Sequence, residues 1–190
     1  MAADAPDPPQ LVVFDFDGTL VDSDEALRAA FRANGVDPEG IEMGLPVAAA
    51  CREAGITVEA YVRAYDTSVV GPYPGVADLL RALPRWAVLS NKHPESALAE
   101  LRRLGWEPEA LMCADAFGWD HKSLVPMLDA LGLSGREVVM VGDSAGDVRC
   151  AEEVGARFVW AGWNRRVQDL APSGEVAATP SALLALLGLR

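Results

Sequence analysis

The sequence predicts an α/β fold, in which a doubly wound parallel sheet forms the core and a small α-helical segment is inserted into it. Short apolar runs alternate along the chain with amphipathic helical patterns, and one long stretch between the first two runs shows helical patterns only. Continuous apolar runs of this length are typical of parallel strands that are covered on both faces. With 190 residues, 51% of them hydrophobic, the chain can bury one sizeable core and at most one further small module.

Five apolar runs are the predicted strands, and helical patterns lie between them. The strands are expected at residues 11–14, 86–89, 111–113, 138–141 and 158–160. Two of the helices end before a glycine, the residue that most readily adopts the left-handed conformation at a helix C-terminus. Their expected apolar stripes are Leu98, Leu101 and Leu104 before Gly105, and Val125, Leu128 and Leu131 before Gly132.

The stretch from residue 22 to residue 70 interrupts this alternation. Apolar residues recur there at helical spacing, first around Phe31 and again around Tyr61, and no strand pattern occurs. We therefore predict a helical cap at 22–70, inserted into an α/β core made of residues 11–21 and 71–190. Residues 1–10 are rich in proline and acid, which predicts a flexible tail.

Charge and cysteine content narrow the function classes. A net charge of −12 and a pI near 4.5 disfavour nucleic acid as a partner. No run approaches the roughly 20 apolar residues that span a bilayer, and the N-terminal residues do not resemble a signal peptide, so we expect a cytoplasmic protein without a membrane partner. Cys51, Cys113 and Cys150 are widely spaced and are expected to be small buried side chains.

The first candidate site is Asp15-Phe16-Asp17-Gly18-Thr19, which directly follows the first predicted strand. Ligands of open α/β sheets bind at the carboxyl ends of the strands. Alternation along an extended chain directs Asp15 and Asp17 to the same side, and two neighbouring carboxylates favour a hard cation such as Mg²⁺. The competing interpretation is a strand end with solvated turn acids.

A second acidic sequence, Gly142-Asp143-Ser144-Ala145-Gly146-Asp147, follows the strand at 138–141. Asp143 and Asp147 are four residues apart at the start of a predicted helix, so both can approach one ion. The alternative is that Asp143 or Ser144 caps the helix and Asp147 is an acid of its first turn.

Polar residues that follow the strand at 86–89, Ser90-Asn91-Lys92, and a lone Lys122 before a helix complete the candidates. Taken singly, each has an ordinary explanation as a turn or a solvated lysine.

In order, these pieces resemble the four motifs of the haloacid-dehalogenase-like (HAD) hydrolases, and the resemblance extends over residues 11–187. The motifs correspond to Asp15 through Thr19, Ser90, Lys122, and Gly142 through Asp147. The chain most resembles the phosphoglycolate-phosphatase-like branch, which has a Rossmann-like core and a helical cap just after the first motif. The cap is short for this branch. Lys122 is followed by Ser123 where the branch usually has proline, so Lys92 is an alternative ammonium.

The resemblance implies a Mg²⁺-dependent phosphatase that forms a phospho-aspartyl intermediate on Asp15, with Asp17 as general acid and base. The presence of Asp17 also argues for phosphate esters as substrates, because the dehalogenating members of the family lack this acid. The phosphate-binding residues would be Gly18, Thr19, Ser90, Asn91 and Lys122. Mg²⁺ would be held by Asp15, the Asp17 carbonyl and Asp143, with Asp147 completing the shell directly or through water.

Other functions remain open on the sequence. A phosphomutase would use the same nucleophile, a receiver-like signalling domain would also phosphorylate an aspartate, and the fold also supports a binding protein without activity. The expected substrate is a small phosphorylated metabolite, whose identity the sequence does not give, and the oligomeric state is equally open. The basic residues of the cap are four arginines, one of which is the expected partner if the substrate carries a second anionic group. They are Arg28, Arg32, Arg52 and Arg63. The alternative is that all four are solvated helix residues offset by nearby acids.

Overall fold

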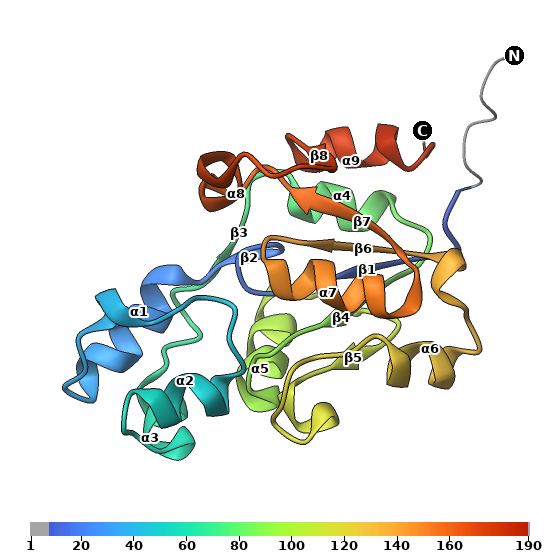
Figure 1. Ribbon diagram of the computed structural model, residues 1–190. Helices are drawn as coiled ribbons and strands as arrows, with labels where there is room; N and C mark the ends of the chain where they lie inside the picture. The colour runs from blue at the N-terminus through green and yellow to red at the C-terminus, as the bar shows by residue number, and fades with distance from the viewer. Residues whose placement is uncertain (1–7, 190) are drawn as a thin grey trace, which may run out of the picture.

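A six-stranded parallel sheet forms the core of the computed structural model, which describes residues 8–189 (Figure 1). The strand order is β5-β4-β1-β6-β7-β8, so the first strand lies in the middle, between β4 and β6. The strands are β1 (Leu11–Phe14), β4 (Trp86–Leu89), β5 (Leu111–Met112), β6 (Val138–Gly142), β7 (Arg157–Ala161) and β8 (Glu175–Ala177). The α/β prediction is confirmed, and β8 is an edge strand that the apolar pattern does not reveal because two of its three residues are exposed.

Side chains of β1 alternate between two separate apolar clusters, one on each face of the sheet. Val12 and Phe14 pack on the face covered by α4, α5 and α9, whereas Leu11 and Val13 pack on the face covered by α6 and α7. The helices are α4 (Val76–Ala82), α5 (Pro94–Leu104), α6 (Val125–Leu131), α7 (Ala145–Val154), α8 (Arg165–Leu170) and α9 (Pro180–Leu186). Because both faces are covered, β1 and β6 are fully buried, as their continuous apolar sequences require.

Two of the predicted helix stripes need correction. In α5 the residue that packs inside is Ala97, while Leu98 is 40% exposed, because the buried positions follow the spacing 97, 101 and 104. In α6 the predicted Val125 is 41% exposed and Leu124 and Met127 are buried instead. Gly105 and Gly132 end the two helices in the left-handed conformation, as predicted.

The segment that follows β1 leaves the core through a short two-stranded ribbon, which the sequence does not predict. Strand β2 (Val21–Asp22) pairs with β3 (Gly71–Pro72), so the chain enters and leaves the insertion side by side. Between them lie α1 (Asp24–Ala33), the 3₁₀ turn η1 (Pro38–Gly40), α2 (Val47–Glu53) and α3 (Val58–Ala64), grouped at one end of the molecule (Figure 1). Phe31 and Tyr61 stack in their shared interior.

The remaining connections are short and include two further 3₁₀ turns, η2 (Ala114–Phe117) and η3 (Gly135–Glu137). The predicted tail lies largely outside the described residues, but its last residue, Gln10, hydrogen-bonds to Glu137 through backbone and side chain. The three cysteines are buried and free. Within residues 8–189, no helix is long and apolar enough to cross a membrane.

Candidate active site

Three loops place polar side chains together at the carboxyl ends of the central strands. Asp15 follows β1, Ser90 follows β4 and Asp143 follows β6, and these strands are neighbours in the sheet. The turn after Asp15 requires Gly18, which has a φ of +81°. A side chain there would also collide with the Asp143 carboxylate and with Arg166. Gly18 therefore allows the turn after β1 to lie against the Asp143 side chain.

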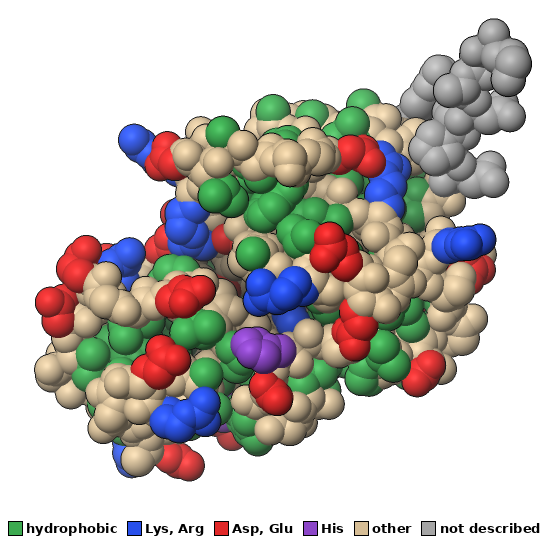
Figure 2. Space-filling view, viewed as in Figure 1, with side chains coloured by type: hydrophobic (Ala, Val, Ile, Leu, Met, Phe, Trp, Pro, Cys, Tyr) green, Lys and Arg blue, Asp and Glu red, His purple; other side chains and the backbone are tan. Residues whose placement is uncertain are grey.

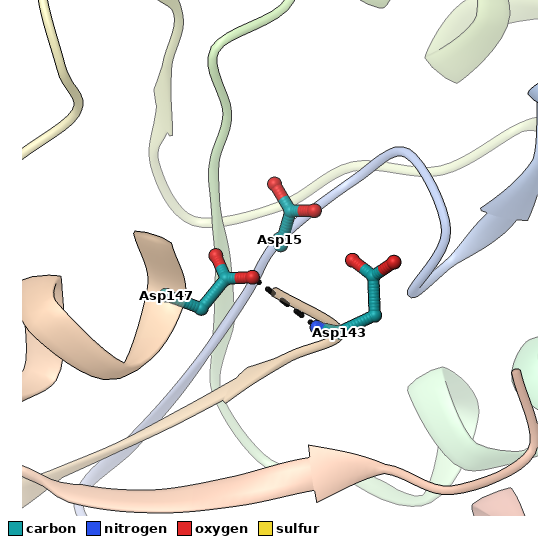
Figure 3. Close-up of side chains that lie close together, drawn as sticks. All are labelled: Asp15, Asp143 and Asp147. Atoms are coloured by element: carbon teal, nitrogen blue, oxygen red, sulfur yellow. Dashed lines mark hydrogen bonds between the residues drawn. The ribbon is translucent and has the colours of Figure 1, made fainter. Parts of the chain in front are cut away.

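Asp15, Asp143 and Asp147 form a buried cluster of carboxylates (Figure 3). One oxygen of each lies within 4.8 Å of the others. Burial raises the pKa of Asp15 well above its ordinary value, and Asp147 and Asp143 raise it further while Lys122 opposes them. Burial and Asp147 likewise raise the pKa of Asp143 to about 6, against the effect of Arg166. The cluster thus holds more negative charge than its surroundings neutralise.

Lys122 is the cation at the centre of this cluster. Its Nζ lies 2.5 Å from Asp15 Oδ1 and 2.6 Å from Asp147 Oδ1, and only 4% of its side chain is exposed. Burial lowers the pKa of Lys122, but Asp147 and Asp15 raise it by more, so the ammonium form is favoured. Its backbone N–H donates to Asn91 Oδ1 at 3.0 Å, which fixes the loop before α6 against the loop after β4.

Asp147 takes the place in the first turn of α7 that its sequence position offered, and it also pairs with Lys122. Oδ2 accepts hydrogen bonds from the Ser144 backbone and hydroxyl and from the Asp143 backbone, which is the capping box of α7. Oδ1 faces Lys122. With both oxygens engaged, Asp147 holds the lysine and the Asp143 loop, and direct binding of an ion would require it to give up one of them. Gly142 is needed beneath it because a Cβ there would overlap the Asp147 side chain.

Two residues after β7, unforeseen from the sequence, hold Asp143. Arg166 Nη2 lies 2.6 Å from Asp143 Oδ2, and Asn164 Nδ2 donates to the same oxygen at 3.1 Å. Arg166 also pairs with Asp24 at the start of α1. Among residues 8–189, Oδ1 of Asp143 accepts a hydrogen bond only from the Thr19 hydroxyl, at 3.4 Å. The sequence did contain a signal for these two residues. Asn164 and Arg166 follow an apolar strand, just as the polar residues of the three other loops do.

Asp17 lies apart from the carboxylate cluster and faces Lys92. Lys92 Nζ is 2.7 Å from Asp17 Oδ1, and the Asp17 side chain is 21% exposed. If Asp17 contributes to a metal site, it does so through its backbone carbonyl, because its carboxylate is directed to the lysine. The two candidate lysines therefore have different partners: Lys122 contacts Asp15, and Lys92 contacts Asp17.

The other predicted phosphate-binding residues divide into two groups. Ser90 and Asn91 line a pocket beside Asp15, where Ser90 is 1% exposed and Asn91 also donates to the Gly44 carbonyl of the insertion at 2.9 Å. Gly18 and Thr19 do not line this pocket. Instead, their backbone carbonyls accept hydrogen bonds from Asn164 and Trp163, respectively, which secures the turn after β1.

The pocket lies between the insertion and the carboxyl end of the sheet, with about 70 Å³ of free volume. Its floor carries the polar side chains of the site. Its other walls are mainly apolar and come from α1, α2, α3 and the loop before α2; they include Leu27, Phe31, Ile41, Met43, Leu45, Val47, Ala50 and Tyr61. Of the four arginines of the insertion, only Arg28 lines it. The face in Figure 2 shows acidic and basic side chains interspersed over the surface.

The carboxylate cluster fits a divalent cation. Its donors are hard carboxylate oxygens of the kind that Mg²⁺ prefers, and they are buried together with raised pKa values at Asp15 and Asp143. Asp143 Oδ1 and the second oxygen of Asp15 have no strong partner among the described residues. A cation at this position would offset the charge that Lys122 and Arg166 leave uncompensated.

Comparison with known proteins agrees with this geometry. Residues 12–161 match the sequence model of the haloacid dehalogenase-like hydrolases. A phosphoglycolate phosphatase of Chromobacterium violaceum is 31% identical over 80% of this chain and 84% of its own. A phosphoglycolate phosphatase of Xanthomonas campestris is 28% identical over 85% of this chain and 86% of its own.

Solved structures share the fold at lower identity. CbbY from Rhodobacter sphaeroides, crystallised in complex with phosphate, has a TM-score of 0.74 and 22% identity, and the match covers 95% of this chain and 100% of that one. A hydrolase from Pseudomonas syringae has a TM-score of 0.76 and 21% identity, with 95% and 98% covered. The likeness extends over the insertion as well as the sheet, because almost the whole of each chain is matched.

Proposed function

The chain is a phosphatase of the haloacid dehalogenase-like hydrolase family, and from that premise we propose that it hydrolyses a small phosphate monoester through a phospho-aspartyl intermediate on Asp15, with Mg²⁺ as cofactor. The observation that carries the proposal is the contact of Asp15 with Lys122 at the floor of a pocket. A buried carboxylate beside an ammonium, at the end of a central strand, is arranged to meet a phosphoryl group.

In the first step, a carboxylate oxygen of Asp15 attacks phosphorus and the bond from phosphorus to the alcohol oxygen breaks. Lys122 contacts Oδ1 of Asp15 and so fixes the orientation of this carboxylate for the attack. Lys122, the Ser90 hydroxyl and the Asn91 backbone N–H would bind the phosphoryl oxygens, because phosphoryl transfer depends mainly on positioning and charge neutralisation. All three residues line the pocket beside Asp15.

Asp17 would donate the proton that the leaving alkoxide needs. It also lines the pocket, on the side nearer the insertion. In the second step Asp17 would take a proton from water, whose oxygen attacks phosphorus while the bond to Asp15 breaks. Inorganic phosphate leaves and Asp15 returns to its carboxylate form. The same residue thus serves as acid and then as base.

Asp15, the Asp17 carbonyl and Asp143 would hold Mg²⁺, with Asp147 orienting Lys122 and the Asp143 loop. The bound ion would neutralise charge on the phosphoryl group and on the carboxylates around it. Arg166 and Asn164 engage Asp143 Oδ2 and so keep Oδ1 turned toward the cluster. Thr19 would support this oxygen from the other side.

We assign residues 22–70 as the cap, residues 11–21 and 71–190 as the core, and residues 1–10 as a tail. The β2–β3 ribbon marks both crossings between cap and core, which supports these boundaries. The cap supplies most of the apolar pocket wall and so would select the alcohol part of the substrate. Several relatives are named phosphoglycolate phosphatases, which makes small phosphorylated metabolites the first substrates to assay.

The test is a panel of phosphate monoesters assayed with Mg²⁺, together with the Asp15→Asn variant. We expect turnover by the wild type and a loss of about a thousandfold or more in the variant, with unchanged thermal unfolding, since one oxygen is replaced by an amide of equal size. Retention of more than about a tenth of kcat, under roughly 1.4 kcal/mol of barrier, would show that Asp15 is not the nucleophile. Transfer of phosphate to another alcohol instead of water would identify a mutase.

A further inference from the structure

A second buried lysine, Lys92, lines the same pocket as Lys122, and the proposed mechanism gives it no role. Lys92 follows Ser90 and Asn91 at the end of β4, and its side chain is 4% exposed. Its Nζ is 2.7 Å from Asp17 Oδ1, 2.7 Å from the Tyr65 hydroxyl and 3.3 Å from Glu100 Oε1.

Two of the three N–H donors of the ammonium are used in hydrogen bonds, to Asp17 and to Tyr65, and the Glu100 carboxylate adds an ion pair. These contacts direct the ammonium of Lys92 to Asp17, whereas the ammonium of Lys122 contacts Asp15. The rings of Tyr65 and Phe16, with centroids 4.4 Å and 5.7 Å from Nζ, further enclose the charge. Lys92 is thus directed to Asp17 rather than to the phosphate site.

The partners of Lys92 come from three parts of the chain. Asp17 lies in the turn after β1, Glu100 is on α5 in the core, and Tyr65 directly follows α3 in the insertion. Glu100 is 0% exposed, and a buried carboxylate is costly unless a cation accompanies it. Among residues 8–189, Lys92 is the cation with which Glu100 forms an ion pair. Glu100 therefore helps to fix the position of Lys92, because no other described cation neutralises this carboxylate.

Asp17, by contrast, has little else to fix it. Its carboxylate makes one side-chain hydrogen bond among the described residues, the one from Lys92. An aspartate side chain that is not held samples several rotamers, and proton transfer requires the carboxyl group within hydrogen-bond reach of the leaving oxygen.

We propose that Lys92 is a positioning residue that holds the Asp17 carboxylate toward the leaving-group oxygen, and that Glu100 and Tyr65 fix Lys92 for this task. The inference rests on the proposed function, since it concerns the acid and base of that reaction. It differs from a purely structural role, in which Lys92 would only neutralise Glu100 and join the insertion to the core.

Substrates with different leaving groups distinguish a positioning role of Lys92 from a purely structural one. An alkyl phosphate needs the proton from Asp17, whereas an activated aryl phosphate such as p-nitrophenyl phosphate needs it far less. A misplaced Asp17 should therefore lower kcat for the alkyl ester by about tenfold or more beyond the loss for the aryl ester. KM should change little for either, because in this proposal Lys92 acts on Asp17 and not on the phosphoryl group.

The central variant is the double substitution Lys92→Met with Glu100→Gln. It removes both buried charges together, so it avoids the cost of leaving one of them unpaired, and we expect thermal unfolding near that of the wild type. Lys92→Arg is the second variant, which keeps a cation for Glu100 but cannot place the same single donor on Asp17. Lys122→Met is the matched control, since it should impair both esters equally.

A selective loss on the alkyl ester in either folded variant supports the positioning role. Equal losses on both esters, or no loss in both variants, would overturn it. The underlying function is checked separately with Asp15→Asn: if that variant still hydrolyses the aryl ester, the proposed nucleophile is wrong, whatever the Lys92 variants do. If Asp15→Asn is inactive and the Lys92 variants show no dependence on the leaving group, only the inference about Lys92 fails.

Discussion

Two buried lysines line the same pocket, and each forms ion pairs with two carboxylates. Lys122 lies between Asp15 and Asp147, all of them in the core, whereas Lys92 lies between Asp17 and Glu100 and also contacts Tyr65 of the insertion. Both side chains are 4% exposed. Since their burial and charge are alike, their separate roles must come from the partners that each one meets.

The difference indicates how the site divides its work. The Lys122 side contains the proposed nucleophile and two further acids, and would handle the phosphoryl group and the metal. The Lys92 side contains the proposed proton donor and would handle the leaving group, next to the apolar wall from the insertion. Substitutions of either lysine, and of the residues around the two lysines, can test this comparison.

The largest effect is expected for Lys122→Met. It removes the cation from between Asp15 and Asp147, so activity should fall by about a hundredfold or more on every ester. Folding should also suffer, by about 3 kcal/mol in the absence of metal, because two buried carboxylates lose their partner. Kinetics and urea unfolding of the purified variant measure the two losses. A stable variant with normal kcat would mean that the lysines do not divide the chemistry as described.

The next effect concerns the two acids that follow β6. Asp143→Ala should raise the Mg²⁺ concentration needed for half-maximal activity by about tenfold or more, since Asp143 Oδ1 is available to an ion. Asp147→Asn should raise it less and should instead loosen Lys122 and the start of α7. Metal titration by activity and by calorimetry compares the two variants. The reverse order would make Asp147 the direct ligand.

A smaller effect links metal binding to pH. Because burial raises the pKa of Asp143 to about 6, the folded metal-free protein holds this proton more tightly than the unfolded chain does. The resulting stabilisation is complete below the ordinary pKa of 3.8 and is lost as the pH rises through about 6. Mg²⁺ needs the carboxylate form, so its effect on stability should grow over the same range.

Thermal unfolding with chelator and with Mg²⁺ tests this dependence. The increase in Tm on adding Mg²⁺ should be larger at about pH 7.5 than at about pH 5, and it should nearly vanish in the Asp143→Ala variant. An equal increase at both pH values would indicate that the ion does not bind through this carboxylate.

Ca²⁺ should restore little activity, because its looser coordination does not fix the geometry of attack.

The smallest effect is expected at Arg28, in the part of the pocket wall that the insertion supplies. Of the cap arginines it alone lines the pocket, and its ion pair with Glu39, at 3.4 Å, is loose. Arg28→Met should raise KM a few-fold for a phosphate ester that also carries a carboxylate, and should spare p-nitrophenyl phosphate. Arg52→Met is the control, because Arg52 does not line the pocket. If Arg28→Met affects neither substrate, the cap selects by shape.

Much of the fold followed from local patterns. The strands β1 and β6 were predictable because burial on both faces demands continuous apolar runs, and Asp15 and Asp143 then had to lie at carboxyl ends of strands. The ribbon of β2 and β3 was not predictable, since a pair of two-residue strands leaves no periodic pattern. Leu98 was misplaced because two rotations of the same helix fit the apolar spacing, and only the packing of α5 chooses Ala97.

By itself, the sequence determined which residues are candidates for the chemistry and where along the strands they stand. The tertiary structure decided how they pair. Strand order brings β1 next to β4 and β6, so Lys122 and Lys92 reach different aspartates, a choice that spacing along the chain left open. Glu100 looks like an ordinary helix residue in the sequence and is fully buried in the fold. Pairing depends on contacts between distant segments, and those are fixed only when the sheet and the insertion pack together.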